Sequence, residues 1–202
     1  MTVQSIWPQR NQLRLQGIDL KNTKLSCQPE TLTATASHSW SPPPPDLFKI
    51  NYDGAVFEEA NQSGIGVVIR NTQGLVISSL TRQLPQVYQV FEIEVLAAIQ
   101  ALEFGLEVGI DQAIVEGELE IVVKALASKD SGLASFGLLV KVANVCATSY
   151  SRLAYSHTRR EGNKVAHSLA RLAVSISNYV VWMENVLPHI YHVFQANKAI
   201  LS

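Results

Sequence analysis

Polar and hydrophobic side chains alternate in the segment from Leu47 to Phe57, and a period of two predicts a β-strand. Two further β-rich runs follow, from Ser63 to Arg70 and from Gly74 to Arg82. Asn71 and Gly74, which separate these runs, supply the geometry of a turn. Three successive strands joined by short loops predict an antiparallel meander.

After Pro85 the spacing of the apolar side chains changes to that of an α-helix, for which Gly109 provides a stop. The remaining pattern predicts a strand over Ala113 to Glu116, helices over Leu119 to Ala127 and Leu133 to Ala147, a strand over Arg152 to His157, and a helix over Lys164 to Ser175 that Gly162 and Asn163 open. Because the later strands need helical crossovers to run parallel, the order βββαβααβα predicts an α/β fold. We expect a five-stranded mixed sheet, three antiparallel strands followed by parallel strands, flanked by helices.

The two ends of the chain differ from this central part. Residues 1–45 are mostly polar, lack sustained periodicity and end in four prolines, which favour an extended polyproline II spacer. We expect a disordered Pro-rich leader over residues 1–45, in which Trp40 can pack back as an isolated anchor. The folded domain is then expected over residues 46–175, and a C-terminal appendage over residues 176–202 is expected to dock through its apolar side chains.

Composition narrows the class of protein. A chain of 202 residues that is 47% hydrophobic and 16% charged suits one compact domain with additional sequence. The net charge of −1 provides no general attraction to nucleic acid, so any such binding must be local. Neither a signal peptide nor a membrane span is visible, and two cysteines give no disulfide framework. We therefore expect an intracellular protein, in the nucleus or the cytoplasm, that is monomeric and makes no membrane contact.

Three carboxylates occupy positions that call for an explanation. Asp53 lies inside the first predicted strand, where a buried carboxylate needs a partner, unless it begins a turn at Gly54. Glu94 shares a helical face with alanines that would pack on the sheet, although the dipole of the first helical turn also stabilises an anion. Glu118 follows a strand and precedes a helix, a corner typical of active sites in α/β sheets and equally of ordinary helix starts.

A basic segment from His157 to His167 runs from a strand into the last predicted helix. Asn163 and His167 are four residues apart and therefore share one face of that helix. The cationic side chains of this segment can contact phosphates, because guanidinium groups match phosphate oxygens and helix N-termini favour anions. An ordinary solvated loop with a capped helix is the alternative interpretation.

Five motifs, taken in order, resemble the type 1 ribonuclease H domains of plants, many of which derive from non-LTR retrotransposons and accompany a reverse transcriptase. The motifs are Lys49-Ile50-Asn51-Tyr52-Asp53-Gly54-Ala55, Gly64-Ile65-Gly66-Val67-Val68-Ile69-Arg70, Glu94-Val95-Leu96-Ala97-Ala98, Val115-Glu116-Gly117-Glu118 and Arg160-Glu161-Gly162-Asn163-Lys164-Val165-Ala166-His167. The resemblance extends from about Trp40 through the C-terminal tail.

The resemblance implies an endonuclease that cleaves the RNA strand of an RNA/DNA hybrid without sequence specificity. Enzymes of this family use four acidic residues to hold two Mg²⁺ ions, for which Mn²⁺ can substitute. By position, the catalytic residues and metal ligands would be Asp53, Glu94, Glu118 and His167. Asp53 would bridge both ions, and Glu94 would help to hold one of them. The family usually has Asp where this chain has Glu118 and His167, so both positions depart from its pattern.

The resemblance and the basic segment together predict the side of the molecule that would contact nucleic acid. The expected contacts are Asn51, Gly54, Ser63, Arg159, Arg160, Asn163 and Lys164. Glu118 and His167 leave a second interpretation open, a catalytically weak or inactive nucleic-acid-binding module of the same fold. A third is a protein-interaction domain without nucleic acid, which the acidic balance and the apolar tail would permit.

Overall fold

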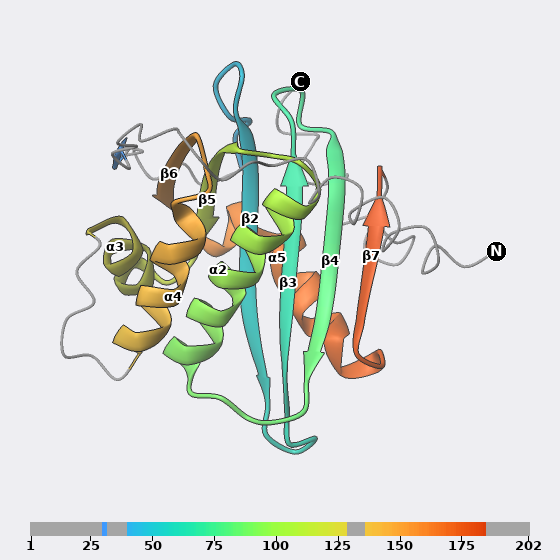
Figure 1. Ribbon diagram of the computed structural model, residues 1–202. Coiled ribbons are helices and arrows are strands. Elements are labelled where there is room, and N and C mark those ends of the chain that lie inside the picture. The colour runs from blue at the N-terminus through green and yellow to red at the C-terminus, as the bar shows by residue number, and fades with distance from the viewer. Residues whose placement is uncertain (1–29, 32–39, 129–135, 185–202) are drawn as a thin grey trace, which may run out of the picture.

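The computed structural model describes residues 30–31, 40–128 and 136–184, which form one sheet with helices on both faces (Figure 1). Its strand order is β1-β6-β5-β2-β3-β4-β7. Helices α2 and α4 lie in front of the sheet in Figure 1, and α5 lies behind it. The predicted α/β class and mixed sheet are confirmed. Most of the leader predicted over residues 1–45 lies outside the described ranges.

The predicted meander forms the centre of the sheet. Strand β2 (Phe48–Phe57) pairs antiparallel with β3 (Gln62–Arg70), which pairs antiparallel with β4 (Val76–Leu84). Gly74 has a φ of 74°, a left-handed conformation that suits glycine at the turn before β4. Strand β5 (Gln112–Gly117) then runs parallel to β2, and β6 (Arg152–His157) runs parallel to β5.

The predicted number of five strands was wrong, because the sheet continues at both edges. Strand β7 (Tyr179–Met183) pairs antiparallel with β4, and the two-residue β1 (Glu30–Thr31) pairs parallel with β6. Strands β1 and β7 are both short. A segment of this length forms a strand only where it can pair with the backbone of a neighbouring strand. The apolar side chains of the predicted appendage therefore mark an edge strand between residues 179 and 183.

The helices follow the predicted order. They are α2 (Val90–Glu107), α3 (Glu120–Ser128), α4 (Gly137–Ala147) and α5 (Arg160–Leu172), which is extended by the 3₁₀ turn η2 (Ala173–Ser175). The first residues predicted for α4 lie outside the described part of the chain. Helix α5 begins at Arg160 and not at Lys164, since Arg159 is the extended N-cap and Gly162 and Asn163 already lie inside the first turn. Among the described residues, no helix combines the length and apolarity needed to cross a membrane.

Two of the three hydrophobic clusters among the described residues hold the helices on the sheet. The larger core lies between the sheet and helices α2, α3 and α4, and it includes Ile50, Leu102 and Leu126. The smaller core lies under α5 and includes Val68 and Leu169. Residues Gly64 and Gly66 of β3 allow α5 to approach the sheet, because a Cβ at either position would collide with the helix backbone. This close seating brings the start of α5 beside β2.

Trp40 precedes the predicted start of the domain at residue 46. It packs on the same side of the sheet as α5. Its side chain is 3% exposed, and its indole Nε1–H donates a hydrogen bond of 2.9 Å to Asn51 Oδ1. The guanidinium of Arg70 lies 4.4 Å from the centroid of the indole ring, at cation–π distance. The segment before residue 46 therefore contributes a buried side chain to the folded unit.

Candidate active site

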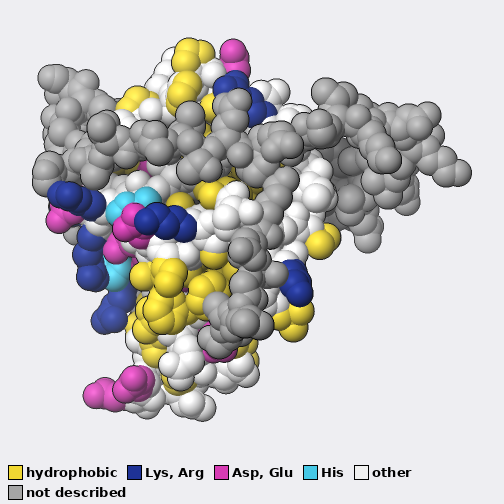
Figure 2. Space-filling view, turned by 90° about the vertical axis from the view of Figure 1, so that its left-hand side faces the viewer, with side chains coloured by type: hydrophobic (Ala, Val, Ile, Leu, Met, Phe, Trp, Pro, Cys, Tyr) yellow, Lys and Arg dark blue, Asp and Glu magenta, His cyan; other side chains and the backbone are white. Residues whose placement is uncertain are grey.

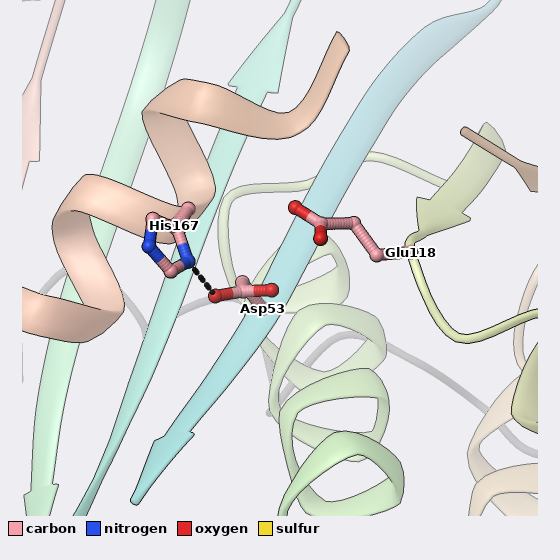
Figure 3. Close-up of side chains that lie close together, drawn as sticks. All are labelled: Asp53, Glu118 and His167. Atoms are coloured by element: carbon pink, nitrogen blue, oxygen red, sulfur yellow. Dashed lines mark hydrogen bonds and ion pairs between the residues drawn. The ribbon is translucent and has the colours of Figure 1, made fainter. Parts of the chain in front are cut away.

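Asp53 lies in the middle of β2 and its side chain points toward α5. The alternation of β2 places it on the same face as Lys49 and Asn51, and its ladder partner is Gly66, over which α5 crosses. The side chain is only 4% exposed. Its Oδ2 atom lies 2.9 Å from Nδ1 of His167, a residue of α5 (Figure 3). The buried carboxylate expected to need a partner therefore has one.

Glu118 joins this pair from the end of β5. Because β5 runs parallel to β2 and pairs Glu116 with Asn51, the residue that follows β5 lies beside Asp53 (Figure 3). One potential ligand atom from each of Asp53, Glu118 and His167 falls within 4.8 Å of the others. His157 Nε2–H donates a 2.9 Å hydrogen bond to the backbone carbonyl of Glu118 and so fixes the corner. The corner predicted to carry chemistry is part of the cluster.

Glu94 approaches the same point from α2, on the opposite face of the sheet. Burial raises the pKa of Glu94 well above its ordinary value of 4.5, and the charges of Asp53 and Glu118 raise it further. A hydrogen bond with the backbone of Gly54 opposes this shift. Residue 54 is a glycine at a point where a Cβ would lie 3.0 Å from atoms of Ile93, which allows α2 to approach β2. The charge of Glu94 therefore interacts with those of Asp53 and Glu118, while the group of side chains whose potential ligand atoms lie within 4.8 Å of one another is Asp53, Glu118 and His167.

The electrostatics of the cluster fit a cation. Burial and then the charge of Asp53 raise the pKa of the half-buried Glu118, while His167, Arg160 and a hydrogen bond with Asn163 lower it. Within the part of the chain that the structure describes, the buried atoms Glu94 Oε2 and Glu118 Oε1 have no hydrogen-bond partner. Carboxylates that repel one another and keep buried oxygens unpaired are stabilised by a divalent cation, and hard cations such as Mg²⁺ prefer oxygen ligands. The residues present therefore fit a divalent metal.

The predicted contacts to nucleic acid divide into exposed and buried side chains. Arg159, Arg160 and Lys164 are exposed at the start of α5, and Gly54 is half-buried. Figure 2 shows Lys and Arg side chains gathered around histidine and acidic side chains on one face of the molecule. This distribution provides the local positive charge that the net charge of the chain does not supply.

The other predicted contact residues, Asn51, Ser63 and Asn163, have buried side chains. Asn51 is 0% exposed. Its Oδ1 accepts a hydrogen bond of 2.9 Å from Trp40, and its Nδ2–H donates one of 2.9 Å to Glu116 Oε2. Ser63, also 0% exposed, accepts a hydrogen bond from the backbone of Tyr88. Asn163 is 1% exposed and donates to the backbone carbonyl of Tyr52. These side chains hold the framework together, because strand pairing and the seating of α5 cover them.

One contact in the site was not predicted from the sequence. Arg160 donates a hydrogen bond of 2.8 Å to Nε2 of His167. The two residues are seven apart, which is two helical turns, so they share one helix face. A helix start predicted at Lys164 left Arg160 outside the helix and concealed this relationship.

The comparisons with known proteins agree with this architecture. The chain belongs to the family described as Reverse transcriptase-like, whose profile matches residues 51–173. No curated protein sequence matches the chain. Among solved structures, the fold is similar to that of ribonuclease H1 from Halobacterium salinarum, with 21% sequence identity and a TM-score of 0.59 over 64% of this chain and 98% of that one.

Two further structures share the fold. The N-terminal RNase H domain of a Mycobacterium tuberculosis protein is 21% identical with a TM-score of 0.58, over 64% of this chain and 94% of that one. LC11-RNase H1, a protein isolated from compost by metagenomics, was solved in complex with an RNA/DNA hybrid. It is 23% identical with a TM-score of 0.56, over 63% of this chain and 96% of that one. The chain therefore has the ribonuclease H fold.

Proposed function

We propose that the protein is a metal-dependent endoribonuclease that cleaves the RNA strand of RNA/DNA hybrids. The observation that carries this proposal is the cluster of Asp53, Glu118 and His167, whose potential ligand atoms lie within 4.8 Å of one another, beside the buried carboxylate of Glu94. Membership of the Reverse transcriptase-like family and the fold shared with a hybrid-bound ribonuclease H1 support the substrate class.

The metal would be held by Asp53, Glu118 and His167, which form the cluster, and by Glu94, whose charge interacts with those of Asp53 and Glu118. Mg²⁺ is the ion that an oxygen-rich site favours, and Mn²⁺ is a substitute for it. Bound divalent ions in nucleases activate a water molecule and stabilise the leaving oxygen of an in-line displacement. The resemblance to ribonuclease H favours two ions, and the catalytic residues would be Asp53, Glu94, Glu118 and His167.

The protein's exposed cations would position the nucleic acid. Arg159, Arg160 and Lys164 at the start of α5 are expected to contact backbone phosphates beside the carboxylates. Phosphate contacts fix orientation without identifying bases, and a hybrid is recognised through its shape and its 2′-hydroxyl groups. Cleavage without sequence specificity follows from this mode of binding.

His167 favours a second candidate function, a catalytically weak or inactive module that binds nucleic acid through the same surface. An imidazole at this position removes one negative charge from the cluster, and its Nδ1 atom is already bonded to Asp53. The binding surface of Arg159 and Lys164 does not depend on that position. Hybrid binding without cleavage is the result that would distinguish this candidate.

The proposal extends to the origin, domain boundaries, compartment and partner of the protein. The five motifs favour a plant type 1 domain derived from a non-LTR retrotransposon, and the boundaries proposed for the ribonuclease H-like domain are residues 46–175. We further propose that the protein is an intracellular monomer of the nucleus or the cytoplasm. Its partner would be an RNA/DNA hybrid or another nucleic acid, without membrane contact.

Incubation of the full chain with an end-labelled RNA/DNA hybrid tests the proposal, first in Mg²⁺ and then in Mn²⁺. Double-stranded RNA and DNA of the same sequence serve as substrate controls. Cleavage of the RNA strand should be lost in Asp53→Asn and kept in Asp111→Asn, the same change at the exposed residue that precedes β5. Binding without cleavage in either metal would favour the second candidate, and no binding to any duplex would refute both.

A further inference from the structure

A buried network of polar contacts connects residues 40–41 with strands β2 and β5. The indole Nε1–H of Trp40 donates a 2.9 Å hydrogen bond to Asn51 Oδ1, and Asn51 Nδ2–H donates one of 2.9 Å to Glu116 Oε2. Lys49 Nζ lies 3.3 Å from Glu116 Oε1 and donates a 2.7 Å hydrogen bond to the backbone carbonyl of Ser41. The side chains of Trp40, Lys49, Asn51 and Glu116 are at most 6% exposed. The contacts therefore form a closed, buried loop that begins and ends in residues 40–41.

This network lies immediately before the candidate site in both strands. Asn51 and Glu116 are the last pair in the register of β2 and β5, and beyond them the two strands part. Asp53 and Glu118 each follow two residues later, on either side of the gap that opens there (Figure 3). The bond between the side chains of Asn51 and Glu116 therefore ties the strands together where the spacing of the two carboxylates is set.

Trp40 also lies against the start of α5, the element that carries His167. A Cβ at Gly162, in the first turn of α5, would lie 3.6 Å from the backbone nitrogen of Trp40. The next residue, Asn163, donates a 2.9 Å hydrogen bond to the backbone carbonyl of Tyr52. Trp40 therefore contacts β2 and α5 directly, and it reaches β5 through the amide of Asn51.

We propose that Trp40 is a positioning residue that sets the spacing of Asp53, Glu118 and His167, and with it the affinity of the site for a divalent ion. The inference rests on the proposed metal site and adds to it a determinant that precedes the predicted domain. Carboxylates repel one another in the absence of a cation, so a framework must hold them close together before the ion binds. Loss of a group that orients metal ligands typically weakens metal binding by about 10–100-fold. Because Trp40 acts through Asn51, the lower end of this range is expected.

Titration of the full chain with Mn²⁺, with free Mn²⁺ measured by electron paramagnetic resonance, tests this role without any activity measurement. Trp40→Phe keeps most of the ring and removes the indole N–H, and it should bind Mn²⁺ roughly tenfold more weakly than the wild type. Trp182→Phe is the matched control, the same change at a half-buried position of β7 at the edge of the sheet, and should leave the affinity unchanged. Circular dichroism identifies a temperature at which all variants are folded. Equal affinity in the wild type and in Trp40→Phe would overturn the inference.

A double-mutant cycle with Asn51→Ala tests the route by which Trp40 acts. If Trp40 acts through its bond to Asn51, Trp40→Phe should cause no further loss of Mn²⁺ affinity in the Asn51→Ala background. Losses that add in the double variant would overturn the inference and leave the proposed function standing. A wild-type chain that binds no Mn²⁺ would instead refute the proposed metal site itself, so the two failures are distinguishable.

Discussion

Gly66 lies directly opposite Asp53 in the β2–β3 ladder, and the backbone of α5 passes over it so closely that a Cβ would collide with Ala166 and Ala170. This relationship places His167 within hydrogen-bond distance of Asp53. The site therefore depends on the absence of a side chain at residue 66 as much as on the side chains that are present.

Gly66→Ala should displace α5, because the colliding atoms belong to the helix backbone and cannot rotate away. We expect a loss of about 1–3 kcal/mol in the free energy of unfolding, the usual cost of overpacking. Urea denaturation measures this loss, and Gly74→Asn is the control, because Asn tolerates the left-handed turn conformation of residue 74. A variant as stable as the wild type would show that α5 is not tightly seated.

Asp53→Asn should abolish hybrid cleavage, since the substitution removes the central carboxylate of the proposed metal site. A fall of roughly a thousandfold in kcat corresponds to about 4 kcal/mol of lost transition-state stabilisation. In the absence of metal the variant should fold normally, because it relieves the repulsion that, after burial, raises the pKa of Glu94. Single-turnover kinetics and thermal unfolding in EDTA measure the two effects separately, and retained cleavage would exclude Asp53 from the chemistry.

Glu94 should make the metal-free protein less stable as the pH rises. The pKa of Glu94 is raised in the folded state, so between its ordinary value of 4.5 and the higher folded value the unfolded chain loses this proton first. Its contribution to stability is complete below pH 4.5 and is lost as the pH rises through the folded pKa. Thermal unfolding in EDTA from pH 5 to pH 8 should show a decline.

Glu94→Gln should reduce this decline, whereas the matched change Glu59→Gln, at an exposed position after β2, should leave it in place. Mg²⁺ should restore stability at the higher pH, because the ion binds the ionised carboxylates of the folded state only. An identical pH profile in the wild type and in Glu94→Gln would refute the assignment of this dependence to Glu94.

Trp40→Ala should destabilise the protein by about 3–5 kcal/mol, the usual cost of truncating a buried aromatic side chain. It would remove the stacking partner of Arg70 and the donor to Asn51. Trp40→Phe keeps most of the ring and removes the N–H donor, so a loss of about 1 kcal/mol is expected. Chemical denaturation of both variants measures this difference, and no loss in either would mean that the segment before residue 46 is dispensable for folding.

Lys164→Gln should weaken hybrid binding for every sequence to a similar extent. Lys164 shares a helix face with Arg160 and His167 and is exposed beside the carboxylates. Removal of one phosphate contact is expected to reduce the slope of log affinity against log salt by about 1. Fluorescence anisotropy at several salt concentrations measures this slope. Lys141→Gln, at an exposed position of α4, should leave it unchanged.

Much of the architecture follows from the sequence alone, because side-chain periodicity records which face of an element is buried. The alternation around Tyr52 predicted β2, and the four-residue spacing of Asn163 and His167 placed them on one helix face before the helix was seen. The order of strands and helices and the positions of Asp53 and Glu94 within their elements were equally visible. These properties are local, and each depends only on residues a few positions apart.

Tertiary structure decided which of these side chains are available and what each one contacts. Asn51 and Ser63 are polar and lie in a family motif or beside one, yet both are buried in the folded sheet, where Asn51 contacts Trp40 and Ser63 contacts the backbone of Tyr88. The bond from Arg160 to His167 depends on where α5 begins, and the bond from His167 to Asp53 depends on how closely α5 crosses β3. Periodicity specifies the face that a side chain occupies, whereas its partner is set by distant segments that pack against that face.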